Sequence, residues 1–186
     1  MAPARDGRGW RRDAPGASGP DARPAPAAVR GARGRRLALT EHRQLGVDLF
    51  NDVWRLLEKT DRTPEEDDEA VHQAHASAYH WLKAPESEPK NRARSEWLCS
   101  RVYAVLGRPE PALHHATRCL EITEQHADNV EDWDLPFAYE ALARAHGVAG
   151  NDGESSRYAA LARESGESIA DPEDREHFVA DLATLT

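Results

Sequence analysis

Two stretches of the chain, SEWLCSRVYAVLGRPEPALHHATRCLEI (Ser95–Ile122) and AYEALARAHGVAGNDGESSRYAALARES (Ala138–Ser165), align without a gap and decide the fold. In each, an apolar helical pattern ends at a glycine, Gly107 or Gly150, and a short polar turn follows. A second helical pattern then carries small residues at every fourth position, which allows two helices to pack closely. Each stretch therefore predicts one antiparallel helical hairpin.

Similar helical patterns continue on both sides of these hairpins. Apolar stripes predict helices over about 40–59, 64–83 and 172–185. The pairs Thr63-Pro64 and Asp171-Pro172 place a capping side chain before a proline, which is typical of a helix N-terminus. The sequence shows no strand-like alternation. We therefore expect an all-α fold of three antiparallel hairpins and a C-terminal capping helix.

The charge is distributed unevenly along the chain. Residues 1–37 hold nine Arg and three Asp, about +6, so a total of −9 leaves about −15 for residues 38–186. The first segment is rich in Ala, Arg, Gly and Pro and poor in aliphatic side chains, so we expect a disordered tail over 1–37 and a helical domain over 38–186. A domain this acidic is a poor nucleic-acid binder. No apolar run reaches the roughly 20 residues of a membrane span, and we expect a cytoplasmic protein.

The two hairpins resemble the tetratricopeptide repeat. That family places small and aromatic residues at set positions of each helical pair. They are matched here by Cys99, Ser100, Tyr103, Gly107, Ala112, Ala116 and Cys119, and by Leu142, Ala143, His146, Gly150, Ser155, Ala159 and Ala162. The period from Gly107 to Gly150 is 43 residues, longer than the 34 typical of the family. The blocks AHASAYHW, RSEWLCSRVYAVLGR and FAYEALARAHGVAG also resemble a bacterial group, common in actinobacteria, of tetratricopeptide-like proteins without an assigned activity.

The resemblance implies a concave groove lined by the first helix of each pair. The positions that would line it are Arg94, Trp97, Arg101, Phe137, Glu140 and Arg144. Arginines beside aromatic rings suit a ligand that carries a carboxylate on an apolar or extended chain. An alternative interpretation makes Glu140 and Arg144 a surface pair spaced i, i+4 and Trp97 a core residue.

The histidines and cysteines give weaker signals. His75 and His80 could line a polar pocket beside Trp97, whereas Cys99 and Cys119 occupy small-residue positions expected to be buried. Glu69 and His72 have a spacing used by metal sites, but neither the fourth nor the fifth predicted helix supplies a matching pair. We therefore predict no metal site and no cofactor.

The sequence favours a non-catalytic module that binds a protein or peptide partner. It lacks a glycine-rich phosphate loop, a GxSxG turn and an HExxH motif, so we do not expect an enzyme. Two alternatives remain open. One is a helical protein, or an enzyme, that binds a small molecule or metal through a histidine-rich pocket, and the other is a structural protein that forms a homodimer.

Overall fold

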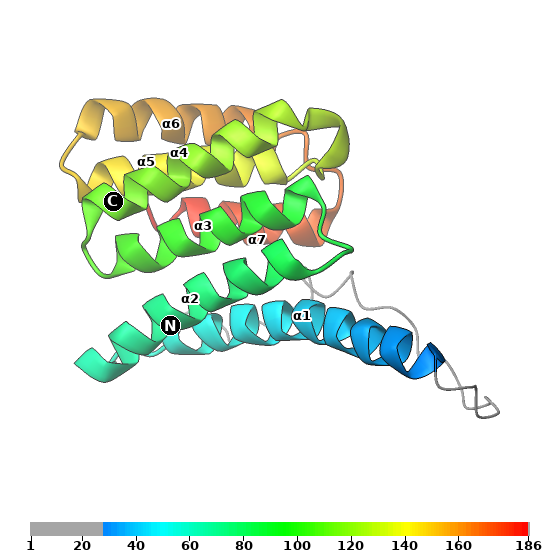
Figure 1. The fold of residues 1–186 in the computed structure, drawn as a ribbon. Helices are drawn as coiled ribbons and strands as arrows, with labels where there is room; N and C mark the ends of the chain where they lie inside the picture. The colour runs from blue at the N-terminus through cyan, green and yellow to red at the C-terminus, as the bar shows by residue number, and fades with distance from the viewer. Residues whose placement is uncertain (1–27, 186) are drawn as a thin grey trace.

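The computed structural model describes the backbone of residues 28–185 and the side chains of residues 41–185. This part of the chain is helical and contains no strand, which confirms the predicted all-α class (Figure 1). The elements are α1 (Ala28–Leu57), α2 (Pro64–Lys83), α3 (Pro89–Val105), α4 (Pro109–Gln125), the short 3-10 helix η2 (Ala127–Asn129), α5 (Asp134–Val148), α6 (Asp152–Gly166) and α7 (Pro172–Leu182).

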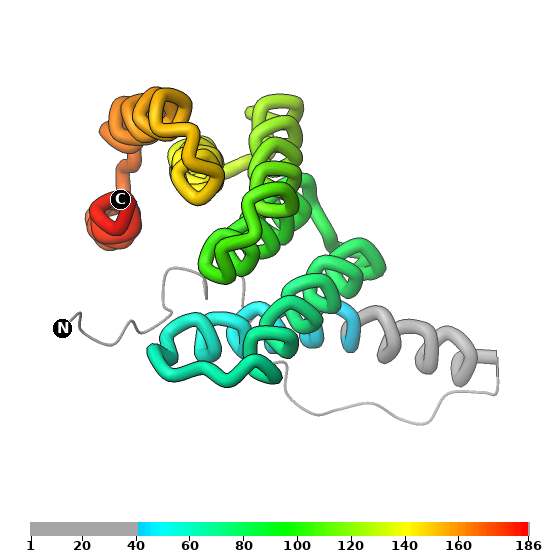
Figure 2. Tube along the Cα trace, turned by 90° about the vertical axis from the view of Figure 1, so that its left-hand side faces the viewer, coloured from blue at the N-terminus to red at the C-terminus, as the bar shows by residue number. Residues whose placement is uncertain are grey.

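Sequential helices pack as pairs. The most extensive contacts join α1 to α2, α3 to α4 and α5 to α6, and smaller ones join α2 to α3 and α4 to α5. Helix α3 also contacts α5, and it touches α1 slightly. Figure 2 shows the pairs stacked in a curved row, with α7 lying beside α5 and α6.

The N-terminal helix differs from the prediction. Helix α1 begins at Ala28 rather than at Thr40, so its backbone includes residues 28–37, which the sequence analysis placed in the tail. The last proline before the helix is Pro26, and the residues after it are mainly Ala, Arg and Leu, which are strong helix formers. Helix propensity therefore outweighs the small apolar content of this segment. The predicted disorder of residues 1–27 concerns residues outside the described part of the chain.

Two helix starts form as predicted. Thr63 and Glu66 make a capping box, in which Glu66 N donates to Thr63 Oγ1 at 3.3 Å and Thr63 N donates to Glu66 Oε2 at 3.1 Å. Asp171 accepts hydrogen bonds from the backbone N–H groups of Glu173 and Asp174 at the start of α7. These bonds satisfy backbone donors that have no partner within the helix.

The repeat is visible in the backbone of the second and third pairs. Gly107 and Gly150 adopt φ angles of 65° and 73°, which a glycine reaches without strain. At each of these positions the helix closes with matching bonds, from Arg108 N to Tyr103 O and from Asn151 N to His146 O, both at 2.9 Å. These equal geometries confirm the predicted turns.

A serine also joins the helices of each pair at equivalent positions. Ser100 Oγ donates to Ala112 O in the second pair, and Ser155 Oγ donates to Ala143 O in the third, each at 2.9 Å. Residues 100 and 112 correspond to 143 and 155 in the sequence alignment. The same junction therefore forms twice, with the donor on opposite helices, which supports the register of the alignment.

Helix α7 docks through one aromatic residue. The ring of Phe178 is almost fully buried and makes an edge contact with Phe137 at 5.2 Å between centroids. It lies over Gly166, where an added Cβ would come within 2.2 Å of the ring. The missing side chain at Gly166 thus allows α7 to approach α6 closely.

Candidate functional site

The residues predicted to line a groove come together in the structure. Arg94, Trp97 and Arg101 lie on α3, and Phe137, Glu140 and Arg144 lie on the neighbouring α5. Trp97 and Phe137 meet edge to face with centroids 5.7 Å apart. The two sets thus form one continuous surface, which we call the α3–α5 face.

This face is not an open groove, which corrects the expectation from the sequence. The exposed fractions of Trp97, Arg101 and Glu140 are 2%, 8% and 0%. Helix α7 contributes Phe178 and Asp181 to the contacts that enclose these residues. The sequence placed α7 as a terminal cap, and its docking against α3 as well as α5 was not predicted.

Four charged side chains form a buried network between α3, α5 and α7. Arg101 Nη2 lies 3.2 Å from Asp181 Oδ2 and 3.3 Å from Glu140 Oε1. Arg144 donates to Glu140 Oε1 from Nε at 2.8 Å, and from Nη2 to Asp181 O at 3.1 Å and Thr184 Oγ1 at 2.7 Å. Two arginines thus balance two carboxylates. Burial lowers the pKa of Arg144, and the adjacent Glu140 opposes that shift.

The network neutralises charge without completing every hydrogen bond. Arg101 Nε and Nη2 and Glu140 Oε2 are buried, and none of them has a hydrogen-bond partner among the described residues. A buried guanidinium has five donors in a planar fork and gains most from a carboxylate aligned with that fork. Arg101 is therefore held by ion pairs in the core, and in this conformation its role is structural.

Arg94 has a separate partner. Its Nε and Nη2 donate to the two carboxylate oxygens of Asp134 at 2.8 and 3.0 Å, and its guanidinium lies 3.9 Å from the ring centroid of Trp133. The pairing of Glu140 with Arg144 likewise follows the alternative interpretation of the sequence, although Glu140 is buried rather than at the surface. All three arginines of the α3–α5 face are engaged within the chain.

The predicted pocket of His75 and His80 does not form as one site. His80 turns to α1, where its Nδ1 lies 2.8 Å from Nδ1 of His42. Burial and the neighbouring His42 lower the pKa of His80. His75 faces α3 and α4 instead and lies near Cys99 and His115. The two histidines are spaced i, i+5 on α2, so they point to different sides of the helix and meet different neighbours.

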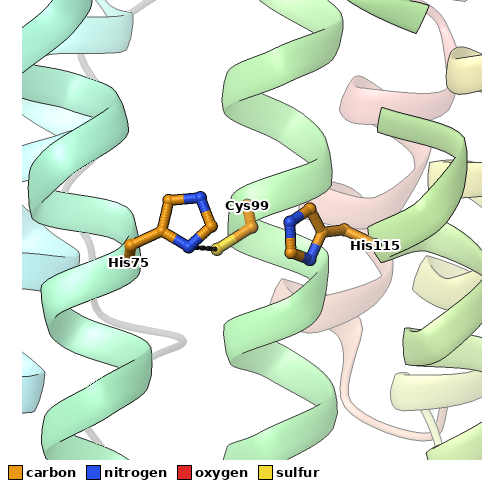
Figure 3. Close-up of side chains that lie close together, drawn as sticks. All are labelled: His75, Cys99 and His115. Atoms are coloured by element: carbon orange, nitrogen blue, oxygen red, sulfur yellow. Dashed lines mark hydrogen bonds between the residues drawn. The ribbon is translucent and has the colours of Figure 1, made fainter. Parts of the chain in front are cut away.

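His75, Cys99 and His115 bring three potential metal ligands together from three helices (Figure 3). One donor atom from each lies within 4.8 Å of the others. The Nδ1 atom of His75 is 4.0 Å from the Cys99 sulfur. We call these three residues the His–Cys–His cluster.

Polar neighbours hold both imidazoles of the cluster. Nε2 of His75 is 2.9 Å from the Tyr103 hydroxyl, and Nδ1 of His115 is 2.6 Å from Oε2 of Glu96. The Tyr103 and His115 rings stack at an angle of 8°. Burial raises the pKa of the Cys99 thiol to about 12 and lowers the pKa of His75, with His115 lowering it further. The Cys99 thiol and the His75 imidazole are therefore neutral at pH 7.

Sequence reasoning missed this cluster because it searched for metal-ligand pairs along single helices. The antiparallel pairing of α3 with α4 could have indicated that Cys99 and His115 lie close together. Since residue 100 meets residue 112 across the hairpin, residue 99 lies within about one turn of residue 115. The third ligand comes from α2, whose register against α3 the repeat does not specify.

Comparisons with models of protein families, with curated proteins and with solved structures found no match to this chain. None of the helices among the described residues is long and apolar enough to cross a bilayer.

Proposed function

We propose that this protein is a non-catalytic helical interaction module whose α3–α5 face binds an acidic, aromatic-bearing helical segment of a protein partner. The observation that carries this proposal is the way α7 occupies the face. Helix α7 places Phe178 against Phe137 and Asp181 against Arg101. It therefore presents the combination that the sequence analysis expected of a ligand, a carboxylate beside an apolar anchor.

The ligand chemistry follows from this intramolecular example. Phe178 and Asp181 are spaced i, i+3, so they share one face of a helix. A partner helix with an aromatic residue three positions before an acidic one could make both contacts at once. A carboxylate aligned with the guanidinium fork of Arg101 would also satisfy donors that Asp181 leaves without hydrogen bonds.

The surface continues beyond the C-terminal end of α7. A hollow of about 100 Å³ lies between α3 and α5, and the residues that line it include Val105, Arg144, Val148 and Leu185. Val105 and Val148 remain 43% and 36% exposed. A partner segment longer than α7 would find apolar contacts there.

Helix α7 is suited to exchange with such a partner. It is 11 residues long, and a helix of this length is marginal in water without tertiary contacts. Its contacts with α5 and α6 are fewer than those within any helical pair. The tetratricopeptide resemblance supports the same proposal, because the first helices of such pairs line the binding face in that family. The cytoplasmic location remains part of the proposal.

A binding assay with the full-length chain tests this function. A fluorescent peptide with the sequence of residues 170–186 should bind a Phe178→Leu/Asp181→Asn variant at least tenfold more tightly than the wild type, because the competing α7 is weakened. A peptide in which Asn replaces Asp181 should bind the double variant more weakly than the parent peptide does. The parent peptide should also bind more weakly to a double variant that additionally carries Arg101→Ala. Val179→Ala, on the exposed side of α7, serves as the matched control. Failure of the folded double variant to bind the parent peptide would refute the proposal.

A further inference from the structure

We propose that His75, Cys99 and His115 form a binding site for one zinc ion, with a fourth position left to solvent or a small ligand. Imidazole and thiolate donors are the set that zinc prefers in proteins, and three protein ligands with one open position is a familiar tetrahedral arrangement. The proposal revises the expectation that the chain holds no metal site, because the structure unites residues that the sequence keeps apart.

The distances are within reach of zinc coordination. Zinc lies about 2.0–2.3 Å from nitrogen and sulfur ligands, which puts tetrahedral donors roughly 3.5 Å apart. The donor atoms of the cluster lie within 4.8 Å of one another, and His75 Nδ1 is 4.0 Å from Cys99 Sγ. Small side-chain rotations, with the three helices in place, would bring them to that separation.

The neighbours of the cluster select the nitrogen that each imidazole offers. The Tyr103 hydroxyl engages Nε2 of His75, and the Glu96 carboxylate engages Nδ1 of His115. This leaves Nδ1 of His75 and Nε2 of His115 for an ion, and in Figure 3 these nitrogens turn toward the Cys99 sulfur. A histidine that binds zinc usually donates its other ring N–H to a carboxylate, a backbone carbonyl or a water, and Glu96 supplies such a carboxylate for His115.

The position of the cluster explains what binding would do. The ligands come from α2, α3 and α4, so an ion would join the first helical pair to the second. Cys99 is almost fully buried, whereas His75 is partly exposed and leaves a route for the ion. On binding, the S–H bond of Cys99 breaks, its proton leaves to solvent, and an S–Zn bond forms.

Metal titration of the chelator-treated full-length protein tests the site. One equivalent of Zn²⁺ should bind and raise the melting temperature, because the folded state alone presents all three ligands. Co²⁺, used as a spectroscopic probe, should show the thiolate charge-transfer band and visible bands of a tetrahedral site. Cys99→Ser should abolish the charge-transfer band, whereas Cys119→Ser, at the other buried cysteine, should keep it.

Variants of the histidines and of Glu96 distinguish zinc bound at the His–Cys–His cluster from zinc bound at exposed histidines. His115→Gln should weaken zinc binding at least 100-fold, and Glu96→Gln on the order of 10- to 100-fold. His72→Gln, at an exposed histidine on the same helix as His75, should leave affinity unchanged. Absence of the thiolate band in the wild type would overturn the proposal without any variant. Equal losses in His72→Gln and His115→Gln would also overturn it, because they would indicate nonspecific histidine binding.

Discussion

The ion pair between Arg101 and Asp181 should make a measurable contribution to the docking of α7. At an effective dielectric constant of about 20, two unit charges 3.2 Å apart attract by about 5 kcal/mol, and desolvation offsets much of this. Contacting residues usually show coupling energies of about 0.5–3 kcal/mol. We therefore expect a coupling of about 1–3 kcal/mol between Arg101→Ala and Asp181→Ala.

The single substitution Arg101→Ala should lower the free energy of unfolding by more than this coupling energy. It removes a cation from beside the buried carboxylates of Glu140 and Asp181, and removal of one partner from a buried pair costs about 3–5 kcal/mol. Urea unfolding of the wild type, both single variants and the double variant, followed by circular dichroism, gives the four free energies of unfolding.

A double-mutant cycle at an exposed ion pair serves as the control for this coupling energy. The exposed pair Arg157 and Glu154 is spaced i, i+3 on α6 and should couple by no more than about 0.5 kcal/mol. If Arg101 and Asp181 couple no more strongly than this control, the ion pair is not formed in solution. Helix α7 would then not be held on the α3–α5 face by this ion pair.

Three further perturbations address other features of the fold. Gly166→Ala should destabilise the protein by about 1–3 kcal/mol in urea unfolding, because its Cβ would meet the buried ring of Phe178. Ala116→Leu should lower the melting temperature through a similar cost of about 1–3 kcal/mol, since Ala116 is fully buried between helices. Stability should also fall as the pH drops below about 6.5, because burial and the neighbouring His42 lower the pKa of His80 in the folded state, so the unfolded chain takes up the proton first.

Each of these expectations has a control. Gly153→Ala lies in open space on α6 and should leave stability unchanged or raise it. Ala160→Leu, on the exposed side of the same helix, should be close to neutral. His80→Gln should reduce the pH dependence between about 5 and 7 and leave the part that comes from the lowered pKa of His75; an unchanged profile would show that His80 does not contribute.

Local sequence signals predicted much of the helical framework. Thr63, Asp171, Gly107 and Gly150 specify where helices start or end through their own side chains or backbone freedom, so neighbours in sequence suffice to interpret them. The start of α1 was placed too late because composition outweighed helix propensity in the prediction. Such errors concern boundaries rather than the class of fold.

The environment of the candidate sites could not be predicted in the same way. Repeat positions brought Arg101 and Glu140 to one face, but the burial of that face depends on Phe178 and Asp181 on a helix with no counterpart in the repeat. The His–Cys–His cluster likewise needs the packing of α2 against α3. Both results depend on tertiary contacts between residues that no periodic pattern relates.

The order in which these contacts can form has a consequence during synthesis. Each helical pair closes through residues near one another in sequence, and such local contacts form quickly. The contact between Arg101 and Asp181 instead spans about 80 residues and joins the last helix to the middle of the chain. On the ribosome, α3 and α5 are complete before α7 has emerged. The newly made chain therefore passes through an interval in which Arg101 and Phe137 are uncovered, and a partner present at that moment would meet them before α7 does.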